Sequence, residues 1–125
     1  MLATTRRAIG AGISSARMQI EGWRDSVLAD RRLRDGSLRM NAETLAALKP
    51  LERVLARLEA AEQALVTAPP VANRKVVTRG LRAGLALAGE YRLAVLEDRS
   101  RLRLVDSAIR KIRAALDAPD LRQSA

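Results

Sequence analysis

The hydrophobic positions between residues 72 and 118 follow a seven-residue repeat. They recur in alternating steps of four and three, and all but one of them are apolar or small. This seam consists of Val77, Leu81, Gly84, Ala88, Tyr91, Val95, Asp98, Leu102, Val105, Ile109, Ile112 and Leu116. A repeat kept over this length is typical of a coiled coil, because it holds one edge of a helix against a partner. We therefore predict one uninterrupted helix over 72–118, which would be about 70 Å long.

Two further amphipathic segments precede this helix. The first covers 5–34, and its seam is Ile9, Ile13, Ala16, Ile20, Trp23 and Val27. The second covers 41–67, and its seam is Ala47, Leu51, Val54, Leu58, Ala61 and Leu65. Pro50 interrupts the second segment, which favours a kink in a helix that begins at Asn41. Alternatively, Pro50 occupies the first turn of a helix that begins near Lys49.

The connections between these segments are short. Ala68, Pro69 and Pro70 stop the second helix, and Asn73 is expected to cap the third. A link of about five residues makes the second and third helices antiparallel neighbours. The third helix is the longest, so the first is needed to cover the rest of it. We predict an all-α fold, an elongated three-helix arrangement with a helical hairpin, in one domain over 1–125 with a frayed tail at 119–125.

Glycine residues stand out within the first predicted helix. Gly10, Gly12 and Gly22 each cost a helix about 1 kcal/mol relative to alanine. One explanation is the close approach of a neighbouring helix to this segment. The other is a segment that becomes helical only under some conditions.

Asp98 is the single charged residue on the long seam. A buried Asp98 would need a cationic partner, such as an arginine from a neighbouring helix or from another copy of the chain. Alternatively, the seam opens there and the carboxylate is solvated. The region 81–96 is also apolar over more of its circumference than one antiparallel partner covers, which favours a homo-oligomer. The residues that we expect at an oligomer or packing seam are Ile13, Ile20, Trp23, Val95, Asp98, Leu102 and Ile109.

The composition is strongly basic. Lys and Arg total 23 against 14 acidic residues, which gives a net charge of +9 and a sequence pI near 11.4. Such a chain is attracted to nucleic acid, to an acidic protein surface or to an anionic membrane. The charge is uneven along the chain, since 73–113 carries eleven bases and four acids whereas 40–72 carries three bases and four acids. The second predicted helix is therefore close to neutral.

Two groups of cations in the third predicted helix are the candidates for binding a polyanion. They are Arg74, Lys75, Arg79 and Arg82 near its start, and Arg99, Arg103 and Arg110 towards its end. Cations at a helix N-terminus oppose the helix dipole unless an anion lies nearby. The alternative is that both groups are ordinary solvated faces, partly offset by acids three or four residues away.

The chain lacks the usual residues of catalytic and metal sites. It contains neither Cys nor His, so thiol chemistry, the commonest metal ligand and the usual general base are absent from the sequence. We expect no enzymatic activity, no metal and no cofactor. With only Trp23 and Tyr91, the chain also lacks aromatic platforms for stacking single-stranded bases. Because no signal peptide or transmembrane segment is evident, the cytoplasm or a virus-like particle is the expected location.

Three functions remain open on this basis. The first is a non-enzymatic helical assembly protein that oligomerises and contacts nucleic-acid backbone without reading its sequence, as in a component of a phage-like particle or packaging machine. The second is an adaptor or export chaperone of the helical-hairpin type that docks on acidic proteins. The third is a membrane-surface protein that acts through the amphipathic segment 9–27.

Overall fold

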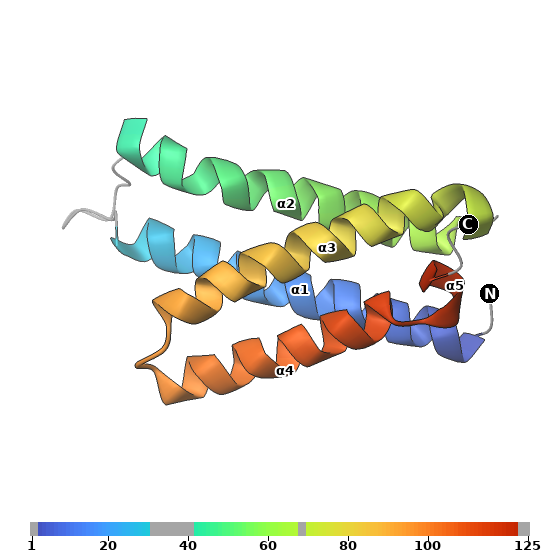
Figure 1. The fold of residues 1–125 in the computed structure, drawn as a ribbon. Helices are drawn as coiled ribbons and strands as arrows, with labels where there is room; N and C mark the ends of the chain where they lie inside the picture. Colours follow the sequence, from blue (N-terminus) through green and yellow to red (C-terminus); the bar gives the residue numbers. More distant parts are fainter. Residues whose placement is uncertain (1–2, 31–41, 68–69, 123–125) are drawn as a thin grey trace.

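The computed structural model describes residues 3–30, 42–67 and 70–122. These residues form α1 (Ala3–Asp30), α2 (Ala42–Val66), α3 (Pro70–Ala94), α4 (Arg99–Leu116) and the short α5 (Pro119–Arg122) (Figure 1). No strand occurs within these ranges. The prediction of an all-α fold is therefore confirmed, although the described part of the chain holds four long helices rather than three.

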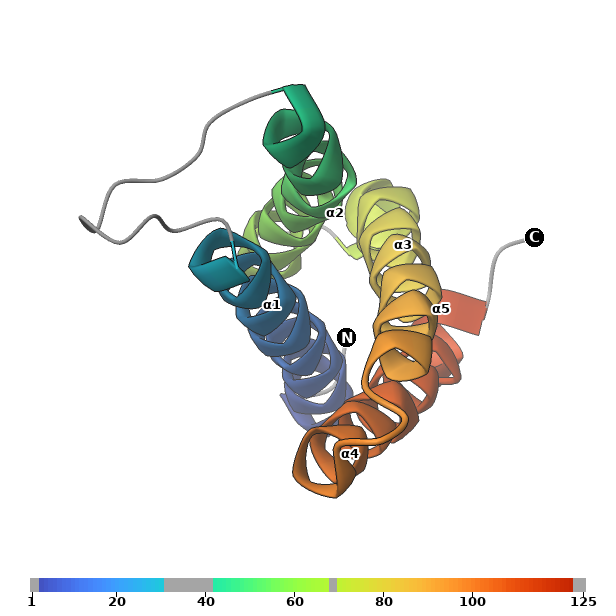
Figure 2. The ribbon, with the colours of Figure 1, turned by 90° about the vertical axis from the view of Figure 1, so that its left-hand side faces the viewer.

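The four long helices form a bundle in which each runs antiparallel to the one before it (Figure 1). α1 packs against α2 and α4, and α3 packs against the same two helices, so the bundle closes on itself (Figure 2). α1 also contacts α3 across the centre of the bundle. The predicted hairpin of the second and third helices corresponds to α2 and α3.

The predicted single helix over 72–118 is wrong, because the chain reverses direction at 95–98. The backbone N–H of Val95 still donates to Tyr91 and Arg92, but Asp98 N–H donates to Val95 O at 2.9 Å and closes a turn. α3 and α4 then lie side by side (Figure 1). The heptad pattern continues through this reversal, because the apolar positions of α3 and those of α4 both face the same core. Periodicity alone cannot distinguish the two arrangements.

Asp98 is the N-cap of α4. Its φ and ψ of −101° and 96° are extended, and its side chain accepts a hydrogen bond from the backbone N–H of Arg101 at 3.2 Å. The carboxylate is half exposed and also lies 3.5 Å from the Arg101 guanidinium. Of the two interpretations of Asp98, the solvated one is therefore correct, and the buried seam position is not.

Replacing Asp98 with alanine is expected to lower the free energy of unfolding by about 1 kcal/mol, because an N–H in the first turn of α4 loses its acceptor. Asp98→Asn is the matched control, since asparagine caps helices about as well as aspartate. Urea denaturation measures both differences. Equal losses in the two variants would show that the charge of Asp98, and not its capping bond, is what matters.

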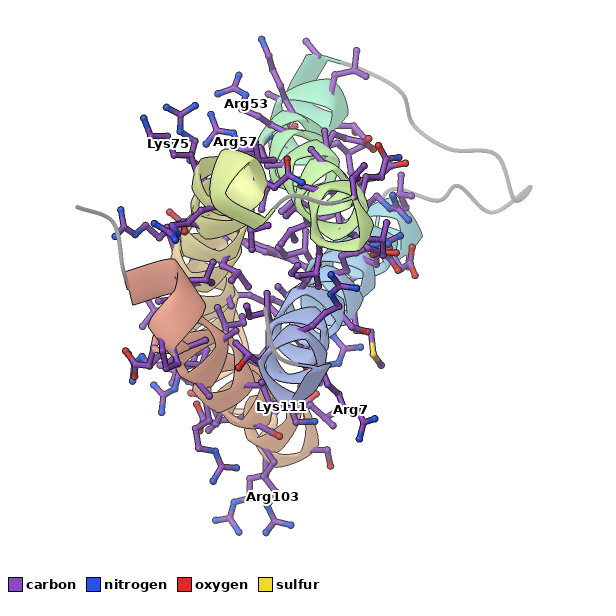
Figure 3. All side chains as sticks on the ribbon, turned by 90° about the vertical axis from the view of Figure 1, so that its right-hand side faces the viewer. Arg7, Arg53, Arg57, Lys75, Arg103 and Lys111 are labelled. Atoms are coloured by element: carbon purple, nitrogen blue, oxygen red, sulfur yellow. The ribbon has the colours of Figure 1, made fainter. Side chains whose placement is uncertain are left out.

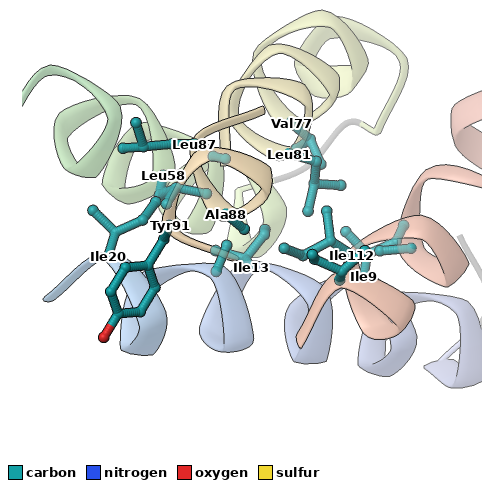
Figure 4. Packing of buried hydrophobic residues seen from close by; sticks show 14 of the residues in the cluster. Ile9, Ile13, Ile20, Leu58, Val77, Leu81, Leu87, Ala88, Tyr91 and Ile112 are labelled. Atoms are coloured by element: carbon teal, nitrogen blue, oxygen red, sulfur yellow. The ribbon is translucent and has the colours of Figure 1, made fainter. Parts of the chain in front are cut away.

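The core is built from all four long helices. The largest fully buried side chains include Ile9, Ile13 and Ile20 of α1, Leu58 of α2, Leu81 of α3 and Ile112 of α4 (Figure 4). The only aromatic pair among the described residues joins α1 to α3: the rings of Trp23 and Tyr91 stack with centroids 5.2 Å apart. Aliphatic residues thus fill narrow helix–helix seams, as expected from a chain without phenylalanine.

Two glycines allow neighbouring helices to approach closely. A Cβ on Gly12 of α1 would lie 2.5 Å from the Cβ of Ala115 on α4, and one on Gly80 of α3 would lie 2.7 Å from the Cβ of Ala61 on α2. Gly22, by contrast, has open space around it. The explanation by close approach therefore holds for Gly12 and not for Gly22.

The ends of the helices differ in detail from the prediction. α3 begins at Pro70, and Asn73 does not cap it but donates its side-chain amide to Ala64 O, at 2.8 Å, near the end of α2. Pro50 lies inside α2, in agreement with a helix that begins well before Lys49. Residues 119–122 form α5, and Leu121 is buried in the core. The predicted end of the first helix at Arg34, the start of the second at Asn41 and the tail at 123–125 lie outside the described residues.

Candidate functional site

The charged residues of α2 are sorted onto two flanks of the helix. Lys49, Arg53 and Arg57 follow one another at intervals of four residues, so they lie within about 80° of each other around the helix axis. Glu52 and Glu59 line the groove between α2 and α1, about 100–120° around the helix axis from Arg53. Although α2 is nearly neutral in total, its side next to α3 is basic.

The basic flank of α2 meets the basic surface of α3. In the view along the bundle, Arg53, Arg57 and Lys75 mark the same corner (Figure 3). Lys75, Arg79 and Arg82 share the side of α3 that faces away from the core. All the members of this surface, which we call the basic α2–α3 face, are exposed: Lys49, Arg53, Arg57, Lys75, Arg79 and Arg82. Glu90, two turns beyond Arg82, is the only acidic residue in the sequence of α3.

A shallow depression lies within the basic α2–α3 face. Arg57 and Arg79 line it on either side, and Ala60, Val76 and Gly80 complete its lining. Because Gly80 has no side chain, the backbones of α2 and α3 approach closely at this point. Two guanidinium groups from different helices are thereby held beside one apolar depression, where they can bind one anionic group together.

The six cations of this face make no ion pair with any described residue. The ion pairs lie on other parts of the surface. Arg17 of α1 pairs with Glu21 and with Glu62 of α2, and the hydrogen bond and the charge of Glu62 raise the pKa of Arg17 above its ordinary value. Arg92 of α3 donates to Asp106 of α4 at 2.6 Å. The internal acids thus neutralise arginines in the α1–α2 and α3–α4 seams and leave the basic α2–α3 face uncompensated.

A second basic surface runs along α4. Arg99, Arg103 and Arg110 are exposed and lie within about 40° of one another, on the side of α4 that points away from the core. Figure 3 places Arg103 on the opposite side of the bundle from Arg53. We call these three residues the α4 stripe. Asp106 lies one turn from both Arg103 and Arg110, and the exposed Glu97 and Asp117 bound the two ends of the stripe, so its charge is weaker than that of the α2–α3 face.

The structure separates the two predicted groups of cations instead of joining them along one rod. Lys75, Arg79 and Arg82 belong to the basic α2–α3 face, whereas Arg74 is half-buried on a neighbouring flank of α3. The contribution of α2 was missed, because its net charge hides the separation of its basic and acidic residues. The signal was present in the four-residue spacing of Lys49, Arg53 and Arg57.

Most of the predicted seam residues pack within the single chain. Ile13, Ile20, Val95 and Ile109 are buried in the core of the bundle. Trp23 and Leu102 are partly buried, and Asp98 is exposed. These side chains therefore have partners inside the protomer, and none of the buried ones requires a second copy to cover it.

The described residues contain no cluster of three or more acidic side chains that could hold a metal ion. Within those same ranges, no helix is both long enough and apolar enough to cross a membrane. Comparisons of the chain with protein-family models, with curated proteins and with solved structures find no match, so only the chain's own geometry supports a functional proposal.

Proposed function

We propose that this protein is a non-enzymatic helical protein that binds the phosphate backbone of nucleic acid through the basic α2–α3 face. The observation that supports this proposal is the presence of six exposed cations, from two helices, without an acidic partner among the described residues. A cation without a partner in the folded chain has no ion pair to give up when it binds a phosphate. Its binding also releases counterions that were condensed on the nucleic acid, which favours the complex.

The basic α2–α3 face suits contacts with the phosphate backbone of nucleic acid and not the recognition of a base sequence. Its residues lie on the outside of two packed helices, and none of the described helices projects from the bundle in the way that a recognition helix enters a major groove (Figure 1). The only stacked aromatic pair of the described residues is the internal one of Trp23 and Tyr91. We therefore propose binding that is independent of sequence and strongly dependent on salt.

The triple variant R53Q/R57Q/R79Q tests this proposal. It is expected to bind a random-sequence duplex about tenfold or more weakly than the unchanged protein, and the negative slope of log K against log salt is expected to become smaller in magnitude by about 3. Fluorescence anisotropy at several salt concentrations measures both quantities. R99Q/R103Q/R110Q is the matched control, since it removes the same net charge from exposed positions on the other side of the bundle.

Two results would contradict the proposal. Absence of duplex binding by the unchanged protein at low salt would reject nucleic acid as the partner and favour an acidic protein surface. Equal losses in the two triple variants would show that net charge, and not the basic α2–α3 face, determines the affinity.

Homo-oligomerisation and a place in a virus-like particle or packaging machine stay predictions. The apolar side chains on which the prediction of an oligomer was based differ in their exposure. Leu87 is buried and Leu85 is partly buried, whereas Leu93 and Leu96 near the α3–α4 turn are exposed. The membrane alternative is less well supported, because Ile9, Ile13 and Ile20 point into the core. The apolar face of α1 is thus already occupied by the other helices.

A further inference from the structure

The two basic surfaces face away from each other. α2 carries half of the basic α2–α3 face, and α2 and α4 lie on opposite sides of the bundle (Figures 1 and 2). In the view along the bundle, Arg53 and Arg57 mark one side, and Arg103 marks the other (Figure 3). Arg99 and Arg110 extend the second side along α4, about 16 Å apart at the helical rise.

The side walls between these surfaces hold the two ion pairs that join helices among the described residues. In the α1–α2 wall, Arg17 pairs with Glu62, and in the α3–α4 wall Arg92 pairs with Asp106. The described cations of the α4 stripe, like those of the α2–α3 face, make no ion pair with a described residue. The ion pairs that join two helices thus lie in these walls, whereas the cations of the two opposite faces form no ion pair with a described residue.

From this arrangement we infer that the protein bridges two nucleic-acid segments, one on the basic α2–α3 face and one on the α4 stripe. The inference rests on the proposed binding of phosphate backbone and adds a second, weaker site to it. It assigns the bridging to a single bundle, in contrast to a dimer in which each copy binds one segment.

The dimensions of the bundle allow both surfaces to be occupied together. Two layers of helices, each about 10 Å in diameter, hold the segments roughly 20 Å apart. This separation exceeds the screening length of about 8–10 Å at physiological salt, so repulsion between the bound segments is small. Binding on one face therefore leaves the affinity of the other nearly unchanged.

A capture assay on beads tests the inference with the full chain. A random-sequence duplex is immobilised, the protein is bound to it, and a second, fluorescent duplex is added at about 0.1 M salt, where the screening length is about 10 Å. The unchanged protein is expected to retain the fluorescent duplex. R99Q/R103Q/R110Q is expected to bind the immobilised duplex within about threefold of the unchanged protein, because its substitutions lie beyond the screening length, and to retain no fluorescent duplex.

The outcomes separate this inference from the proposed function. If the unchanged protein binds the first duplex and never retains the second, the bridging is overturned while backbone binding by the α2–α3 face stands. Retention of the second duplex by R99Q/R103Q/R110Q would also overturn it, since bridging would then arise from two copies that each use one face. If the unchanged protein binds no duplex at all, the proposed function itself fails.

Discussion

Replacing Ile112 with alanine is expected to lower the free energy of unfolding by about 3 kcal/mol. Ile112 is fully buried and lies in the core together with Ile9 of α1 and Leu81 of α3 (Figure 4). The truncation removes apolar contacts and leaves a cavity that the surrounding helices fill only in part. For a domain whose total stability is about 5–15 kcal/mol, this loss is large.

Leu104→Ala is the matched control on the same helix. Leu104 is 61% exposed, so its truncation is expected to change the free energy of unfolding by less than about 0.5 kcal/mol. Urea denaturation followed by circular dichroism gives both values, provided that the dependence on urea is the same in the two variants. Similar losses at Ile112 and Leu104 would contradict the packing of α4 described above.

Replacing Gly12 with valine is expected to cost about 3 kcal/mol, near the upper end of the effect of overpacking. Even a Cβ at this position would meet the Cβ of Ala115 at 2.5 Å and the backbone oxygen of Lys111 at 3.1 Å. A backbone oxygen cannot rotate away, so α1 and α4 must move apart. Leu81 of α3 also lies 3.4 Å from this Cβ, and α3 and α4 can both surround Gly12 only because the chain reverses at 95–98.

Gly22→Val is the control for Gly12→Val, because nothing lies within 4 Å of a Cβ at Gly22. It is expected to leave stability unchanged within about 0.5 kcal/mol, since valine is a slightly better helix former than glycine. Adding Ala115→Gly to Gly12→Val should restore part of the lost stability by reopening space opposite the new side chain. Equal effects at Gly12 and Gly22, with no rescue, would argue against the close approach of α1 and α4.

The separation of charge has a functional consequence that net charge does not reveal. The internal acids pair with Arg17, Arg92 and Arg101 at the helix seams and at the α4 cap, and these pairs are worth only a fraction of a kcal/mol each at a surface. Their greater effect is on location, because the two pairs that join helices, Arg17–Glu62 and Arg92–Asp106, lie in the α1–α2 and α3–α4 walls of the bundle. Nine exposed cations lie on the basic α2–α3 face and the α4 stripe, where none of them forms an ion pair with a described residue.

The sequence predicted the helices better than their arrangement. The heptad spacing of Tyr91, Val95, Leu102 and Ile109, in steps of four, seven and seven residues, gave the correct apolar edge for α3 and α4, but it continued through the turn without a break. No glycine or proline marks 95–98, and the only local signal was Asp98, a good N-cap placed where the seam required an apolar residue. The charge on the seam thus indicated the end of a helix, and not a buried ion pair.

By itself, the sequence determined that this protein is helical, that its core is aliphatic and that it carries a large excess of arginine. These properties follow from local spacing and composition, which act within a few turns of one helix. Only the tertiary structure decided that α3 and α4 fold back on each other, and that Arg53 and Arg57 join Lys75 and Arg79 on one face. The physical reason is that packing between helices decides two things that local spacing does not. It decides which side of each helix is buried, and it decides which charged residues of a neighbouring helix lie beside the side that stays exposed.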